Sequence, residues 1–135
     1  MGSVETVQAM YDAFNAQDWV RFGTYVHDDV EWTNIALERT SNLEQLRSGY
    51  PAFFEAFPDV HVRIVSIFGD GPYVAVEWHA RGTHTGPLLG EPPTGKVFER
   101  RGCSVAEVQN EKIVRYRDYF DRASQLRQLG LMHLV

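Results

Sequence analysis

Residues 97–120 read VFERRGCSVAEVQNEKIVRYRDYF, and this stretch decides the fold. Polar and apolar side chains alternate along 97–108 and again along 112–120, as they do in β-strands that bury one face. The Gln109–Glu111 segment between them has the length of a hairpin connection. We therefore expect two long antiparallel strands, whose apolar face the rest of the chain has to cover.

Further strands are expected on the N-terminal side of this hairpin. One covers about 60–68 and the next about 73–81, and the Gly69–Gly71 turn joins them. A loop rich in glycine and proline, 82–95, then leads into the hairpin. Together these segments predict a meander of antiparallel strands. An additional strand is expected at 29–35, where the same alternation is found.

Apolar residues at helical spacing predict three helices before the meander and a short helix after it. The expected N-terminal caps are Ser3, Asp18, a capping box formed by Ser41 and Glu44, and Asp121. Gly130 is expected to end the last helix, because glycine readily adopts the left-handed conformation that closes a helix. Three helices followed by a long meander predict the α+β class.

Length and composition restrict the classes of protein to consider. The 135 residues suffice for a single domain, 1–135, with 44% hydrophobic and 23% charged residues. The formal charge of −5 and the lack of a basic cluster argue against nucleic acid as a partner, and no apolar run is long enough to span a membrane. The N-terminus lacks the features of a signal peptide, and Cys103 has no partner for a disulfide, so we expect a cytoplasmic protein.

Two sets of motifs resemble the SnoaL-like polyketide cyclase family. The first is GTHTG at 82–86 followed by GEPPTGK at 90–96, which is similar to the loop of that family. The second is KIVRYRDYFD at 112–121 followed by LRQLG at 126–130, which is similar to its closing strand. The opening segment Tyr11–Asn15 fits as well, and the resemblance extends over essentially the whole chain.

The resemblance implies the nuclear-transport-factor-2-like fold, in which a strongly curved antiparallel sheet is closed into a cone by three helices (an α+β roll of the cystatin-like kind). It implies a cofactor-independent cyclase or isomerase that moves protons in an apolar pocket, with ring formation in polyketide-type secondary metabolism as the specific reaction. The limonene-epoxide-hydrolase and ketosteroid-isomerase branches are similar too. Because that superfamily also contains non-catalytic binders, the fold alone does not decide the chemistry.

Asp118 matches the residue that serves as general acid/base in the SnoaL-like cyclases. Strand alternation places it on the same mainly apolar face as Tyr116 and Phe120, and it turns Arg115 and Arg117 to the other face. Burial there would raise the pKa of Asp118 toward the working pH, which suits a group that takes up and returns a proton. The structural alternative is that Asp118 binds a loop amide or an arginine from another strand.

Seven other residues are expected to bind an apolar small-molecule substrate: Trp32, Asn34, Tyr50, Trp78, Arg100, Ser104 and Tyr116. The aromatic ones would form walls, and Arg100, which shares its strand face with Ser104, would bind an anionic or carbonyl group. Asn34, Ser104 or Tyr116 would hold the oxygen on which charge develops. We expect no cofactor and no metal, because the five histidines are scattered along the sequence, and His84 is expected to stabilise its loop.

Several positions depart from the patterns of these families. Gly102 and Ser104 stand where cyclases with an aldol reaction carry glutamine and histidine, and Trp32 stands where they carry an asparagine. Trp78 and Ala80 stand where the limonene-epoxide-hydrolase branch carries its arginine and aspartate. Two alternatives therefore stay open, namely a non-catalytic ligand-binding domain and an enzyme that opens an epoxide with an internal hydroxyl.

The face of the sheet opposite Asp118 carries charges of both signs, at Glu77, His79, Arg81, Glu99, Arg101, Arg115 and Arg117. Such a face suits a solvated surface or a polar interface between subunits. The family resemblance favours a homodimer through this convex face, and we expect Cys103 on the same face to be an inert thiol at the interface.

Overall fold

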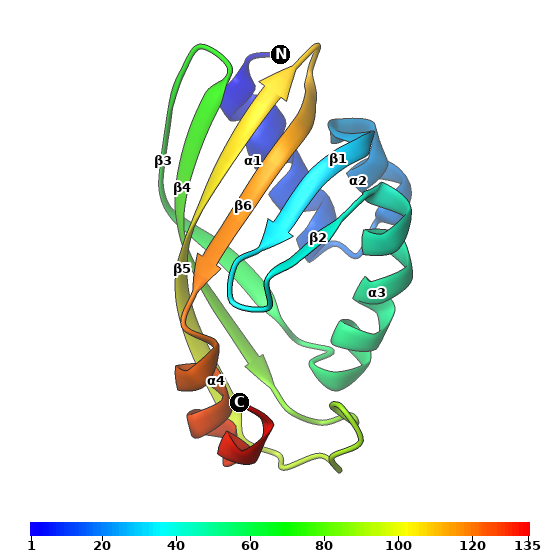
Figure 1. The fold of residues 1–135 in the computed structure, drawn as a ribbon, viewed down its shortest axis with the longest axis vertical. Coiled ribbons are helices and arrows are strands. Elements are labelled where there is room, and N and C mark those ends of the chain that lie inside the picture. The colour runs from blue at the N-terminus through cyan, green and yellow to red at the C-terminus, as the bar shows by residue number, and fades with distance from the viewer.

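The computed structural model describes residues 1–135 and contains one six-stranded sheet and four α-helices. In chain order, the elements are α1 (Ser3–Asn15), α2 (Trp19–Tyr25), β1 (Val26–Asn34), β2 (Arg39–Ser41), α3 (Leu43–Ala56), β3 (His61–Asp70), β4 (Tyr73–Thr83), β5 (Val97–Gln109), β6 (Lys112–Phe120), α4 (Arg122–Leu129) and a final 3₁₀ turn, η1 (Met132–Leu134). Figure 1 shows the sheet curving around the helices, with α4 at the end of β6.

The sheet has the strand order β2-β1-β6-β5-β4-β3. The four strands β3 to β6 form the expected antiparallel meander. β1 pairs with β6 in parallel, so the sheet is mixed at this one junction. Parallel neighbours need a long crossover connection, which α3 and the first strands of the meander supply here. The α+β class with a strongly curved sheet is confirmed.

The tight turn between β5 and β6 has a clear local cause. Gln109 pairs with Lys112, and the two residues between them, Asn110 and Glu111, have φ angles of 51° and 62°. Positive φ at both central residues gives the hairpin turn whose twist matches that of the flanking strands.

The sequence pattern does not predict β2, because the polar Arg39–Ser41 segment has no alternation and pairs only after a turn returns it to β1.

Three of the expected helix ends are confirmed. The Asp18 carboxylate accepts a hydrogen bond from the backbone N of Arg21 (3.0 Å) at the start of α2. Asp121 accepts one from the backbone N of Ser124 (2.9 Å) at the start of α4, which gives this acid the capping role that its position predicts. Gly130 ends α4 with a φ of 75°, in the left-handed region.

The other two caps are wrong by one residue. Ser3 is the first residue of α1, and Gly2 stands at the cap position without a side-chain hydrogen bond. The capping box of α3 is formed by Asn42 and Gln45, with bonds of 2.8 and 2.9 Å, and not by the Ser41–Glu44 pair. The reason is that Ser41 is the last residue of β2, so its backbone belongs to the sheet.

The core lies between the concave face of the sheet and the helices α1, α2 and α3 (Figure 1). A cluster of 26 buried apolar residues fills most of this space. On β4 and β5 the even-numbered residues face inward, as the alternation predicts, while the odd-numbered ones face outward. None of the helices has both the length and the apolar character that crossing a membrane requires.

The loop between β4 and β5 is fixed at both ends. His84 is fully buried, and its Nδ1 accepts a hydrogen bond from the backbone N of Thr94 (3.1 Å). The backbone N of Gly86 donates to the Ala56 carbonyl (3.2 Å), and a Cβ on Gly86 would lie 1.9 Å from the carbonyl oxygen of Glu55. Only glycine can approach the end of α3 this closely. These contacts agree with the structural role expected for His84.

Candidate active site

A cavity of about 560 Å³ opens between the concave face of the sheet and the helices. Of the 24 residues that line it, 16 are hydrophobic, so it suits a largely apolar molecule. Asp118 lines this cavity, together with six of the seven residues expected to bind substrate: Trp32, Asn34, Tyr50, Trp78, Arg100 and Tyr116. The seventh, Ser104, is fully buried behind the wall.

Three neighbouring strands bring Asp118 to its partners. In β6, Asp118 stands opposite Asn34 of β1 on one side and opposite Ser104 of β5 on the other. Because paired residues of adjacent strands point to the same face of a sheet, all three side chains belong to the concave face. The hydroxyl of Ser104 donates a hydrogen bond of 2.7 Å to Oδ1 of Asp118.

The direction of that hydrogen bond is fixed by Trp78. The indole Nε1 of Trp78 lies 2.9 Å from the Ser104 oxygen, and an indole N–H can only donate. Ser104 therefore accepts from Trp78, and its single hydroxyl proton goes to Asp118. The expectation that Ser104 holds a substrate oxygen is not supported, because its hydroxyl is already engaged and faces the carboxyl group rather than the cavity.

The surroundings of Asp118 raise the pKa of its carboxyl group. Burial raises its pKa above the ordinary value of 3.8, while Arg100 and the hydrogen bond from Ser104 act in the opposite direction and only partly offset it. No nitrogen of Arg100 lies within 4.0 Å of an Asp118 carboxyl oxygen. The carboxyl group accepts a hydrogen bond from Ser104 and none from a backbone amide. Neither form of the structural alternative, a loop amide or an arginine pair, is present.

Arg100 reaches the same cavity from β5. Its Nη1 donates to Oε1 of the buried Gln125 (2.7 Å), and its guanidinium group lies over the rings of Phe120 (4.1 Å) and Trp78 (5.3 Å). Its Nε is buried and has no hydrogen-bond partner. Burial lowers the pKa of Arg100, and the nearby Asp118 partly counteracts this. The aromatic rings hold the guanidinium group in place without neutralising it.

One aromatic wall includes a residue that the sequence analysis missed. Trp32 stacks on Tyr116 with ring centroids 3.7 Å apart, and the hydroxyl of Tyr116 hydrogen-bonds to that of Tyr11 in α1. Burial raises the pKa of both phenols well above their ordinary value of 10, so both stay protonated at neutral pH. One signal in the sequence could have identified Tyr11: it lies among the apolar positions of a helix, and the hydroxyl of a buried tyrosine needs a hydrogen-bond partner.

Asn34 has a free donor at the cavity. Its Oδ1 accepts a hydrogen bond from the backbone N of Leu37 (3.1 Å), which fixes the amide plane. Its Nδ2 makes no hydrogen bond within the protein, although the residue lines the cavity directly beside Asp118. A ligand oxygen can therefore accept from Asn34 without displacing another contact.

The departures from the cyclase pattern form one connected arrangement. Trp78 and Gly102 are paired across β4 and β5, and a Cβ on Gly102 would lie 2.2 Å from Cζ2 of the indole. The indole therefore occupies the space above Gly102, where a glutamine side chain would need to go. Its N–H is then satisfied by Ser104, at the position where a histidine would stand.

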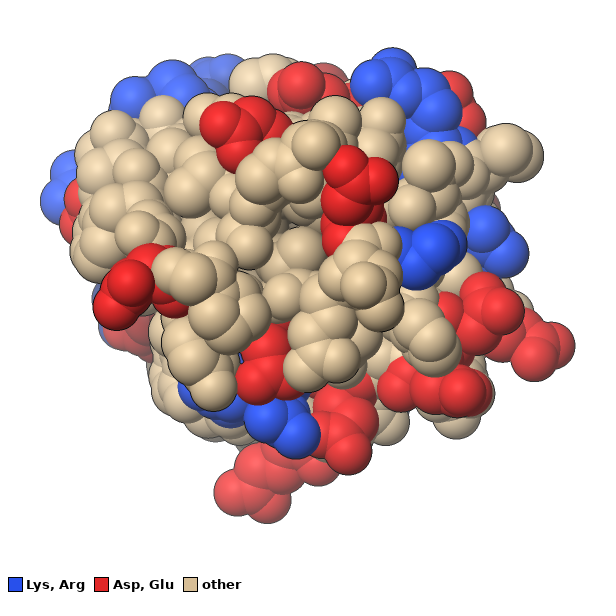
Figure 2. Space-filling view, turned by 90° about the horizontal axis from the view of Figure 1, so that it is seen from above, with Lys and Arg blue, Asp and Glu red and all other residues tan.

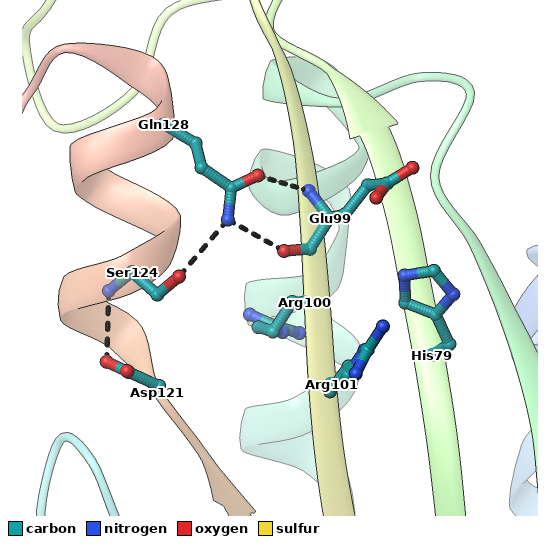
Figure 3. Close-up of a pocket in the computed structure, with 7 residues that line it drawn as sticks. All are labelled: His79, Glu99, Arg100, Arg101, Asp121, Ser124 and Gln128. Carbon is teal, nitrogen blue, oxygen red and sulfur yellow. Dashed lines mark hydrogen bonds between the residues drawn. The ribbon is translucent and has the colours of Figure 1, made fainter.

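A second recess, of about 430 Å³, has a different character (Figure 3). It lies between α4 and the strands β4 and β5, and none of its lining residues is hydrophobic: His79, Glu99, Arg100, Arg101, Asp121, Ser124 and Gln128. Figure 3 shows the Gln128 side chain hydrogen-bonded to the backbone of Glu99, so much of the polar lining of this recess is already paired. No group of three or more histidine, cysteine or acidic side chains is placed to hold a metal ion.

A curved α+β roll around an apolar cavity with one acid defines a small-molecule enzyme or binder. Residues 4–129 match the SnoaL-like polyketide cyclase family, and the chain belongs to that family. Aklanonic acid methyl ester cyclase DnrD of Streptomyces peucetius is 27% identical over 132 residues, which are 94% of this chain and 90% of that protein. Nogalonic acid methyl ester cyclase of Streptomyces nogalater is 37% identical over 60 residues, or 44% and 45% of the two chains.

Among solved structures, wild-type IdmH from Streptomyces antibioticus resembles this fold with a TM-score of 0.87 at 25% sequence identity. The alignment covers 96% of this chain and 99% of that one, so the whole roll is shared. Family and relatives together support ring closure in polyketide-type antibiotic biosynthesis as the function.

Replacing Ser104 with alanine is expected to raise the pKa of Asp118 further, because the serine hydroxyl stabilises the carboxylate form. The change also leaves the Trp78 indole N–H without its partner, which should cost about 1–3 kcal/mol of folding free energy. The carboxyl pKa can be followed by NMR titration and the stability by urea denaturation. Ser66→Ala, at an exposed serine of β3, is the matched control. An unchanged pKa in Ser104→Ala would contradict the assigned hydrogen bond.

Proposed function

We propose that this protein closes a ring in a polyketide-type molecule by an intramolecular aldol addition, with Asp118 as the group that moves the proton. The carboxylate removes a proton from a carbon next to a carbonyl, which leaves an enolate. The enolate carbon attacks a second carbonyl of the same molecule, and a carbon–carbon bond forms as that carbonyl becomes an alkoxide. The proton on Asp118 then returns to the alkoxide oxygen, so no cofactor is consumed.

The observation that carries this proposal is the placement of the Asp118 carboxyl group. It is the only acid lining the apolar cavity, one of its oxygens is held by Ser104, and its pKa is raised by burial. A carboxylate with a raised pKa is a stronger base at carbon than an ordinary one. The free Nδ2 of Asn34 supports a role in holding the enolate oxygen, whereas Tyr116 already shares a hydrogen bond with Tyr11.

Proton removal can be tested separately from ring closure. A β-keto ester or an acylated anthraquinone is incubated with the protein in D₂O, and loss of the proton next to the carbonyl is followed by NMR. We expect the wild-type protein to accelerate this exchange and Asp118→Asn to abolish it. Chromatography of the same reactions detects a cyclised product. Exchange that is equally fast with Asp118→Asn would rule out Asp118 as the base.

The alternative of a non-catalytic binder draws support from one feature: Gly102 and Ser104 replace the glutamine and histidine of the aldol cyclases, and the Trp78 indole covers Gly102. Such a protein would bind polycyclic ketones and quench the fluorescence of Trp78 and Trp32, yet it would not promote exchange. Opening an epoxide with an internal hydroxyl needs only one base and stays a further alternative. Hydrolysis with two acids is disfavoured, because Asp118 has no second acid in the cavity.

We also propose that two copies associate through the outer face of the sheet. Arg101 and Arg117 on that face make no ion pair within the chain, unlike Arg115, which pairs with Glu31 and Glu107. Light scattering at tens of micromolar should give twice the chain mass of 15.4 kDa. Because the face is charged, raising the salt concentration should weaken the association. A monomer at low salt would contradict the proposal.

We propose a reducing, cytoplasmic setting for this reaction. Cys103 is the only cysteine, it is exposed on the outer face, and no disulfide contributes to the fold. A free exposed thiol is most compatible with a compartment in which thiols stay reduced. Fractionation of the cells that produce the protein would test this location.

A further inference from the structure

The charge of the cavity is opposite to the charge of the protein. The chain carries a formal charge of −5, and acidic side chains predominate on the end of the molecule shown in Figure 2. Three arginines nevertheless line the cavity, Arg39, Arg100 and Arg122, against the single carboxyl group of Asp118. None of the three arginines forms an ion pair with an acid of the chain. The cavity is a positively charged site in an acidic protein.

Arg100 is the most deeply placed of these cations, and no acid of the chain pairs with it. One nitrogen is anchored by Gln125, Nε is buried without a partner, and Nη2 makes no hydrogen bond within the protein. Burying a guanidinium group without an anion is costly, and such groups are normally paired. Asp118 lines the same cavity, but none of its carboxyl oxygens lies within 4.0 Å of an Arg100 nitrogen. The anion that would satisfy Arg100 is therefore not part of the chain.

We infer that the substrate carries a free carboxylate, which binds to Arg100 between Phe120 and Gln125. This inference deepens the proposed function, since it names the substrate class for the same cavity. A planar carboxylate matches the planar guanidinium group and can accept two of its N–H donors. Arg122 and the exposed Arg39 lie on the same cavity lining and attract the anion toward it.

The group that would bind the carboxylate, Arg100, and the base, Asp118, lie at different positions along the sheet. Arg100 and Ser104 are on the same face of β5, four residues apart, and Ser104 marks the position of Asp118 on the next strand. A molecule anchored by its carboxylate at Arg100 therefore extends along the sheet toward the base. An ester of the same molecule lacks the negative charge and would bind without this anchor.

The test compares anthraquinone-2-carboxylate with its methyl ester, using the quenching of tryptophan fluorescence and calorimetry. The wild-type protein should bind the free acid at least about tenfold more tightly than the ester. Asp118→Asn should bind the acid more tightly still, because a competing negative charge is removed. Both comparisons use proteins that keep Arg100, so they do not depend on how well an Arg100 variant folds.

Arg100→Met should lose the preference for the acid, while Arg101→Met, the neighbouring arginine on the outer face, should keep it. Equal or tighter binding of the ester by the wild-type protein would overturn the inference and leave the proposed cyclase standing. A preference that survives in a folded Arg100→Met protein would overturn it as well. Failure of both compounds to bind would instead count against the small-molecule site itself, and with it against the inference.

Discussion

Asp118→Asn is expected to lose turnover by about a hundredfold or more, the usual scale for removing a general acid/base, while the protein keeps its fold. The amide oxygen of asparagine can still accept the hydrogen bond from Ser104, so the local geometry survives. Because the pKa of Asp118 is raised overall, its ionised form is less favourable in the folded state than in the unfolded chain, even with Arg100 nearby. The melting temperature should therefore be equal to or higher than that of the wild-type protein.

The same pKa shift predicts opposite pH trends for stability and activity. The folded state binds the Asp118 proton more tightly than the unfolded state does, so this group stabilises the fold most at low pH. Its contribution is lost as the pH rises from the ordinary carboxyl value of 3.8 through the raised pKa. Turnover rises over the same range, since the base has to be ionised. Asp118→Asn should lack the stability trend in thermal melts recorded across this range.

Asp121→Ala provides the control for these experiments. Loss of the α4 cap should cost about 1 kcal/mol of stability and leave turnover largely intact. A destabilised Asp118→Asn protein that still turned over substrate would contradict the catalytic assignment and favour a structural role.

Gly102→Ala is expected to disturb both the fold and the site, although it adds a single methyl group. The new Cβ would lie 2.2 Å from Cζ2 of Trp78, and a rigid indole cannot yield by the bending of a flexible chain end. Overpacking of this kind costs about 1–3 kcal/mol. Trp78 would also have to move away from Ser104, which would free the serine hydroxyl and alter the pKa of Asp118. Urea denaturation and the pH dependence of turnover measure the two effects.

Combining Gly102→Ala with Trp78→Leu tests whether the clash with the indole is what destabilises Gly102→Ala. Each single change should destabilise the protein, but the smaller leucine makes room for the Cβ, so the double variant should be more stable than the sum of the two effects predicts. Gly49→Ala, at a helical glycine with open space around its Cβ position, is the control and should not destabilise the protein. Additive effects in the double variant would show that Trp78 and Gly102 do not constrain each other.

Local patterns were sufficient to predict much of this fold. The period of two along β4, β5 and β6 decides which side chains face inward, because a strand cannot turn single residues to the other face. The inward position of Asp118 and the shared face of Arg100 and Ser104 followed from this alone. Helix caps were predictable to within one residue, and the errors at Ser3 and Ser41 arose where a neighbouring residue took the same role.

The chain by itself thus determined the strands of the meander, the inward acid and the polar outer face, since these depend on residues close together in sequence. Only the tertiary structure decided what surrounds the acid. Ser104 is turned toward Asp118 by Trp78 from another strand, and Tyr11 reaches Tyr116 across 105 positions of sequence. The unpartnered state of Arg100 likewise depends on every segment that closes the cavity. Such contacts depend on register and packing between distant segments, which no local period specifies.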